Sequence, residues 1–168
     1  MDSGAELYGF GAFSAIKAAR FLEDGLVPRI RLLVAFNRVC DADLTITRDL
    51  GSHRLYREDF WSSAAHLGHD DIFRSGQPYE NAMGSHLPFL DVGARRVVFI
   101  SDSVFGGDEA PGLYAGTEDD DLEHCSPKSL QVVGEVTLEA LQAITQRLAK
   151  IDRFSTSPIA KLEQEAVP

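Results

Sequence analysis

Several marks of secreted, membrane-spanning and nucleic-acid-binding proteins are missing from this 168-residue sequence. Its two cysteines, Cys40 and Cys125, are too few for a disulfide framework, and we interpret Cys40 as a small buried thiol, with a reactive cysteine as the alternative. A charged-then-apolar leader and a bilayer-length apolar run are both absent, so cytoplasmic residence is the default prediction. The formal net charge of -10, without a basic stripe, argues against nucleic acid or an anionic membrane as partner.

The composition is nevertheless that of a folded domain. An apolar content of 44% is enough to fill one hydrophobic core, and the sequence has no internal repeat. We predict one domain over residues 1–151, followed by a polar C-terminal tail over residues 152–168.

Apolar spacing predicts helices over 12–24, 57–67 and 126–148. Gly25 is a suitable C-terminal stop for the first helix. In the last helix Ser126 is the expected N-cap, and a proline follows in the first turn.

Three segments have the character of strands. Residues 30–36 and 97–100 are short apolar runs, and the first is expected to be covered on both faces. Residues 43–48 alternate apolar and polar side chains, which predicts a half-exposed strand nearer an edge. The predicted fold class is therefore α/β, a three-layer α/β/α arrangement with a central mixed sheet.

Four segments follow one another in an informative order: the turn 84–90 (GSHLPFL), the strand 97–100 (VVFI), the turn 113–120 (LYAGTEDD) and the helix start 126–134 (SPKSLQVVG). They closely resemble the zinc-exopeptidase family of di-zinc aminopeptidases and glutaminyl cyclases. In that family a D-D-H-x-P-F-L turn, a buried strand, a W-H-T or Y-H-T turn and an S-x-x-S-L-Q helix occur in this order. Upstream, 3–9 resembles the family's G-E-E turn, and 33–44 resembles its L-L-D-M-V-G-D-A-D-L strand. The resemblance runs from about residue 2 to about residue 148 and implies an incomplete zinc-exopeptidase-like domain, its C-terminal half.

Other residues occupy the positions where the resemblance implies a metal site. The general base of the G-E-E turn falls on Ala5, and the strand Asp falls on Asn37, whose neutral amide is a poor zinc ligand. The His of the W-H-T turn falls on Gly116, which leaves Glu6 as a surviving carboxylate. Because a zinc site needs roughly three or four protein ligands, we expect no metal, no cofactor and no metal-assisted amide hydrolysis by this chain alone.

The resemblance brings four polar residues to one cavity. Ser85 replaces the acidic residue before the retained turn histidine, His86. Glu6 and His86 are the candidate catalytic residues, and Asn37 and Ser85 are candidates for binding the substrate. Such groups cannot activate zinc-bound water, but they can orient a substrate by hydrogen bonds and move a proton.

Arginine side chains are the candidate clamp for an anionic group, because guanidinium forks match sulfate, phosphate and carboxylate oxygens. The candidates are Arg38, Arg54 and Arg74, with Arg57 beside them. The alternative is that these are surface arginines paired with local acids.

Length implies a partner. The family domain is much longer than this chain, and a sheet cut near the G-E-E turn would leave an unpaired edge and an uncovered apolar face. We predict a heterodimer with a second polypeptide that resembles the absent N-terminal half. The alternatives are a homodimer that pairs the same edge twice and a truncated chain.

Two classes of function remain open. In the first, the chain is a metal-independent subunit of a heteromeric biosynthetic enzyme. It would act on a small or carrier-bound amino-acid-like substrate by intramolecular amine attack, with loss of an anion, as in the aziridine-forming systems of natural-product pathways that such a split, metal-poor chain resembles. In the second, it is a catalytically dead pseudopeptidase that binds or regulates a homologous partner. The polar replacements Asn37 and Ser85 favour the enzyme.

Overall fold

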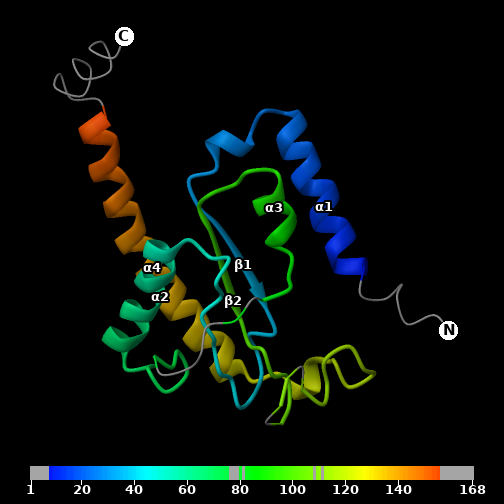
Figure 1. The fold of residues 1–168 in the computed structure, drawn as a ribbon. Coiled ribbons are helices and arrows are strands. Elements are labelled where there is room, and N and C mark those ends of the chain that lie inside the picture. Colours follow the sequence, from blue (N-terminus) through cyan, green and yellow to red (C-terminus); the bar gives the residue numbers. More distant parts are fainter. Residues whose placement is uncertain (1–7, 76–79, 81, 108, 111, 156–168) are drawn as a thin grey trace.

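The computed structural model describes residues 8–155 except 76–79, 81, 108 and 111 (Figure 1). Glu6 and residues 156–168 therefore lie outside the described residues. In chain order the elements are helix α1 (Tyr8–Glu23), 3-10 turn η1 (Val27–Arg29), strand β1 (Leu33–Asn37), helices α2 (Arg54–Leu67) and α3 (Leu87–Asp91), strand β2 (Val97–Ser101), 3-10 turn η2 (Leu122–His124) and helix α4 (Pro127–Ser155).

The elements form three layers, which confirms the predicted α/β class. Figure 1 shows β1 and β2 between α2 and α4 on one side and α1 and α3 on the other. The strands are parallel, and Leu33 of β1 is paired with Val97 of β2. Within the described residues the sheet has these two strands, so the mixed sheet that we predicted is reduced there to one parallel pair.

Apolar side chains on both faces of the strands hold the layers together. Val98 and Ile100 pack with Phe60 and Trp61 of α2 and with Val136 of α4 in the larger cluster. Trp61 is thus a packing residue. On the other face, Val97 and Leu33 pack with apolar residues of α1, η1 and the α3 region.

Both predicted helix-end signals that lie in the described region are present. Gly25 follows α1 with a φ of 64°, a left-handed conformation in which glycine carries no side-chain penalty. The hydroxyl of Ser126 accepts a hydrogen bond from the backbone N–H of Ser129 at 3.4 Å, which satisfies one free donor of the first turn of α4. The helix continues through residues 152–155, which the sequence pattern assigned to the tail.

The prediction of a half-exposed strand over 43–48 is wrong. This segment has an irregular backbone with an isolated antiparallel bridge between Ile46 and Asp102, and its polar residues Thr47 and Arg48 are buried together with its apolar ones. The reason is that the chain following β1 closes the outer edge of β2. The N–H of Thr47 donates to the carbonyl of Ser101 at 3.4 Å, and further along the N–H of His53 donates to the first residue of β2 at 2.7 Å.

The outer edge of β1 is different. Hydrogen bonds to β2 direct the backbone groups of Leu33 and Asn37 towards that strand, so strand alternation directs those of Val34 and Phe36 away from it. In the part of the chain that the structure describes, the backbone groups of these two residues have no hydrogen-bond partner. The Phe36 side chain is 42% exposed, so β1 is not covered on both faces as predicted.

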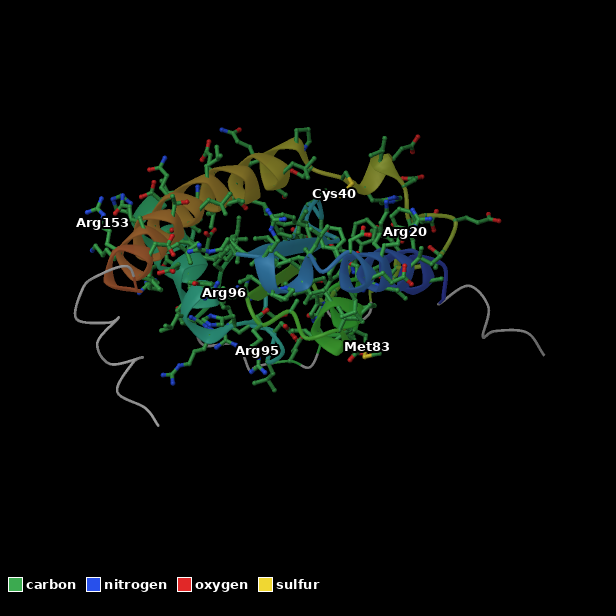
Figure 2. The ribbon with its side chains drawn as sticks, turned by 90° about the horizontal axis from the view of Figure 1, so that it is seen from above. Arg20, Cys40, Met83, Arg95, Arg96 and Arg153 are labelled. Carbon is green, nitrogen blue, oxygen red and sulfur yellow. A yellow bond between two sulfur atoms is a disulfide. The ribbon has the colours of Figure 1, made fainter. Side chains whose placement is uncertain are left out.

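The interpretation of Cys40 as a free buried thiol is also wrong. Cys40 and Cys125 form a disulfide across a sequence separation of 85, with 4.7 Å between their Cα atoms. An antiparallel bridge between Asp41 and Cys125 brings the turn after β1 against the segment that precedes α4. Figure 2 shows the disulfide at Cys40 beside the start of that helix. Pairing across such a separation depends on the tertiary fold, which the count of cysteines does not reveal.

Candidate functional site

Polar residues end both strands. Asn37 is the last residue of β1 and is paired with Ser101, the last residue of β2. Alternation puts both side chains on the α3 face of the sheet, the face on which Leu33 and Val97 pack. The carboxyl ends of parallel strands are where open α/β sheets bind ligands, and Asn37 is exposed there.

Arg38 follows Asn37 in a strained conformation. With a φ of 51° it is the one non-glycine residue with positive φ in the described ranges. A left-handed arginine persists only when its surroundings over-determine it, and such residues cluster at functional sites. The strain therefore supports the prediction that this position has a role.

Asp41 anchors the turn that Arg38 begins. Its Oδ1 accepts a hydrogen bond from the N–H of Asp43 at 3.1 Å, and its Oδ2 accepts one from the N–H of Gly106 at 2.7 Å. Its backbone carbonyl accepts a hydrogen bond from the hydroxyl of Ser129 in α4 at 2.6 Å. The turn over residues 38–43, which we call the β1 turn, is thereby tied to two other segments.

Asp102 lies beside this turn, directly after β2. It is 1% exposed, and its carboxylate accepts hydrogen bonds from the N–H groups of Thr45 and Val104, both at 2.9 Å. Burial raises the pKa of Asp102 to about 6. The two backbone hydrogen bonds and the charge of Arg38 oppose that rise, and the charge of Asp41 adds to it. A carboxyl group with this pKa changes charge close to neutral pH.

We call Asn37, Arg38, Asp41, Ser101 and Asp102 the strand-end cluster. Asp41 and Asp102 were not among the residues predicted from the sequence. Their positions in the sequence could have identified them as site residues. Asp102 directly follows an apolar strand, and Asp41 lies in the segment that resembles G-D-A-D-L.

His86 occupies the same face of the sheet without reaching solvent. It is fully buried, and its ring stacks on the ring of Phe99 with centroids 4.1 Å apart. Among the described residues neither ring nitrogen has a hydrogen-bond partner, and Nε2 lies 3.6 Å from Oδ2 of Asp49. Burial lowers the pKa of His86, while the charge of Asp49 partly offsets this, so the ring is neutral at neutral pH. Ser85 precedes it and is half-buried.

The structure therefore brings His86 near the strand-end cluster but not into contact with it. Phe99 is two residues before Ser101 on β2, a distance of roughly 6.6 Å along the strand. The turn before His86 lies very close to the same ring, because a Cβ added to Gly84 would clash with Phe99 Cζ.

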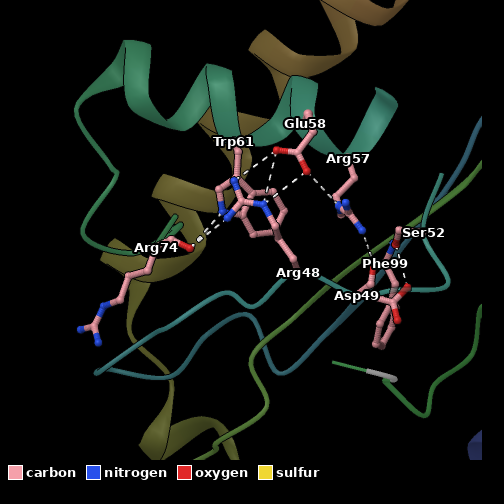
Figure 3. Close-up of polar contacts among 8 residues, drawn as sticks. All are labelled: Arg48, Asp49, Ser52, Arg57, Glu58, Trp61, Arg74 and Phe99. Atoms are coloured by element: carbon pink, nitrogen blue, oxygen red, sulfur yellow. Dashed lines mark hydrogen bonds and ion pairs between the residues drawn. The ribbon is translucent and has the colours of Figure 1, made fainter. Parts of the chain in front are cut away.

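Asp49 belongs to a buried hydrogen-bond network (Figure 3). Its Oδ2 accepts a hydrogen bond from the hydroxyl of Ser52 at 2.8 Å, and that hydroxyl accepts one from the N–H of Phe99 at 2.8 Å. The guanidinium of Arg57 donates to the backbone carbonyl of Asp49 at 2.7 Å. These contacts fix the segment that closes the edge of β2.

Arg57 forms a local ion pair and hydrogen bonds. It lies 3.1 Å from Glu58, which also binds Arg48 at 3.2 Å, as Figure 3 shows. Burial raises the pKa of Glu58, but hydrogen bonds and charge from the two arginines outweigh it and lower that pKa below its ordinary value. The alternative that we kept open, arginines paired with local acids, holds for Arg57.

Of the other two predicted arginines, Arg54 lies apart from the strand-end cluster, and Arg74 lines a cleft beside the β1 turn. Arg54 is exposed at the start of α2, next to His53, which binds the first residue of β2. The first residue of β2 is roughly 13 Å along the strand from Ser101. Arg74 lines a polar cleft of about 280 Å³ with residues of the β1 turn and of the start of α4, and its Nε donates to the carbonyl of Asp71.

Clusters of metal-binding side chains and membrane-spanning helices are both absent from the described part of the chain. Those residues contain no group of three or more His, Cys, Asp or Glu side chains placed to hold a metal ion. None of the helices described there is long and apolar enough to cross a bilayer.

Comparisons with known proteins identify the fold. No family model and no curated protein matches the sequence, but solved structures do. The glutaminyl cyclase of an Acidobacteriales bacterium is 30% identical, with a TM-score of 0.72 over 84% of this chain and 46% of its own. The Porphyromonas gingivalis glutaminyl cyclase is 16% identical (TM-score 0.63; 77% and 48%), and a Zn-dependent exopeptidase from Parabacteroides distasonis is 17% identical (TM-score 0.62; 73% and 43%).

The chain thus has part of the α/β fold shared by glutaminyl cyclases and Zn-dependent exopeptidases, and the resemblance inferred from the sequence is confirmed at the level of the fold. It spans less than half the length of each of these neighbours.

Proposed function

We propose that this chain is one subunit of a heteromeric enzyme that closes a ring in an amino-acid-like substrate, without hydrolysis and without a metal ion. The observation that carries the proposal is Asn37. At the position where the resemblance implies a metal-binding carboxylate, an exposed neutral amide ends β1, and the strained Arg38 follows it. The glutaminyl cyclase among the fold neighbours, 30% identical, supports a ring-closing reaction as one that this fold can carry.

In the proposed reaction the amine of the substrate attacks a carbon of the same molecule. The C–N bond forms as the bond to an anionic leaving group breaks, and the ammonium proton passes to a base. The Asn37 amide orients the substrate and the Arg38 guanidinium holds the departing anion, for which its fork of donors is suited. Aziridine formation with loss of sulfate is the example that we favour.

Glu6 is the proposed base, with His86 in support. Because His86 is fully buried and stacked on Phe99, it would reach a substrate only if α3 moved. Its proposed contribution is to hold the wall of the site on the α3 face, while Ser85, beside it and half-buried, binds the substrate. Arg54 and Arg74 have no proposed contact with the reacting atoms.

We further propose that a second polypeptide completes the fold by adding a strand to β1. The unpaired backbone groups of Val34 and Phe36 and the exposed Phe36 ring support this, because an open strand edge is a template for pairing. The net charge of -10 disfavours pairing with a second copy, since two such chains repel each other.

The test is to co-express the chain with the product of a neighbouring gene that resembles the absent half. The purified pair is supplied with amino acids that carry a sulfate ester near the amine, and mass spectrometry follows the ring-closed product and free sulfate. We expect turnover, and we expect Asn37→Ala to lower kcat/KM roughly 10- to 100-fold through one lost orienting hydrogen bond.

The matched control is Gln131→Ala, which removes an exposed side-chain amide from α4. An intact pair that remains inactive, with Asn37→Ala and His86→Ala changing neither ligand binding nor product, would support the regulatory alternative.

A further inference from the structure

The Cys40–Cys125 disulfide connects the site to another part of the fold. These are the two cysteines of the whole sequence, and both are half-buried, so a small reductant can reach them. Two cysteines that are 85 residues apart meet directly beside the strand-end cluster.

The disulfide is the one covalent anchor of the β1 turn. The carbonyl of Cys40 also accepts a hydrogen bond from the N–H of Ser126 at 2.6 Å, and Asp41 is bound by Ser129 and Gly106. These contacts keep the turn folded against α4 when the disulfide is broken, and none of them involves Arg38.

Those first residues include Arg38 in its left-handed conformation. A strained residue relaxes when its surroundings no longer over-determine it. Cys40 is two residues from Arg38, so breaking the disulfide removes the nearest covalent restraint on Arg38 and leaves hydrogen bonds to hold the turn. The predicted consequence is a changed backbone conformation at Arg38 and a changed position of its guanidinium.

We propose that the disulfide is a redox-controlled clamp that sets the conformation of the β1 turn and of Arg38. In the switching reaction the S–S bond breaks and two thiols form. The two electrons and two protons come from a dithiol, which is itself oxidised to a disulfide. Disulfides in reducing compartments are usually transient or redox-sensing, so the device fits the predicted cytoplasmic residence. The clamp does not depend on the reaction proposed for the site.

The test compares oxidised and dithiothreitol-reduced forms of the full chain by backbone NMR. We expect reduction to shift the amide resonances of residues 38–43, Gly106 and Ser126, and to leave those of β2 and α2 unchanged. Reoxidation with oxidised glutathione is expected to restore the first spectrum. Far-UV circular dichroism establishes that both forms are folded.

The control is the double variant Cys40→Ser with Cys125→Ser. It should give the spectrum of the reduced protein both with and without dithiothreitol. Three results would overturn the clamp: two free thiols that glutathione disulfide does not join, an unshifted Arg38 resonance on reduction, or unfolding of the whole chain on reduction. The last would make the disulfide a stabilising link and not a switch.

Discussion

At the scale of single residues, Asp102 makes the stability of the chain depend on pH. Its folded pKa of about 6 lies above the ordinary value of 3.8, so the folded chain holds a proton that the unfolded chain has lost. The stability contributed by protonation is fully present below pH 3.8 and is lost as pH rises through 6. The loss is about 3 kcal/mol, from a rise of about two pKa units.

Urea unfolding of the wild type and of Asp102→Asn between pH 3.5 and 7.5 measures this contribution of Asp102 to the unfolding free energy. The difference in unfolding free energy between the two proteins should change across pH 4–6 and be constant above pH 7. Parallel profiles over the whole range would show that Asp102 titrates normally.

Gly84→Ala and Gly134→Ala are predicted to change the stability of the chain in opposite directions. A methyl group at Gly84 would meet the ring of Phe99, on which His86 stacks. We expect Gly84→Ala to destabilise the chain by about 1–3 kcal/mol, as overpacking does. Gly134 lies inside α4, and an added Cβ would have no described atom beyond its chain neighbours and its own helix backbone within 4 Å, so Gly134→Ala should stabilise by roughly 0.5–1 kcal/mol. Thermal unfolding of both variants checks the signs, and a tolerated Gly84→Ala would contradict the close packing at this turn.

At the scale of elements, features set by neighbouring residues could be predicted from the sequence, and features set by tertiary contacts could not. The cap at Ser126 and the glycine after α1 act within one turn of their helices, so the sequence alone predicted them. The alternation over 43–48 resembled a strand, but Thr47 and Arg48 are buried because this segment closes the edge of β2. Asp102 and the disulfide were missed because their partners lie far away in the chain.

The open edge of β1 gives the element-scale prediction. Phe36→Lys puts a charge on an exposed edge position, a device that blocks strand pairing. We expect the free chain to change in stability by no more than about 0.5 kcal/mol, and the affinity for the co-expressed second polypeptide to fall by at least roughly tenfold.

Leu138→Lys is the matched control. Leu138 is 66% exposed on α4, on the other side of the sheet from α1 and α3. Analytical ultracentrifugation of the two variants with the partner measures both affinities. Equal binding by Phe36→Lys and Leu138→Lys would remove β1 from the interface.

At the scale of the whole molecule, the fold was predictable further than the site. The order of four segments identified an exopeptidase-like α/β arrangement, which the solved structures confirm. Of the residues predicted for the site, Asn37 and Arg38 lie together at the strand ends, His86 is enclosed beside them, and Glu6 lies outside the described residues. Burial of a histidine depends on how α3 packs on β2, and no spacing in the sequence reveals that.

The central claim is that this strand-end site works in a two-chain enzyme without a metal ion. Its most direct test is the turnover of the purified pair before and after treatment with 1,10-phenanthroline, combined with elemental analysis of the same sample. We expect an unchanged rate of ring closure and zinc well below one atom per complex. Stoichiometric zinc together with loss of turnover on chelation would contradict it, as would zinc-dependent release of N-terminal residues from peptides by the single chain.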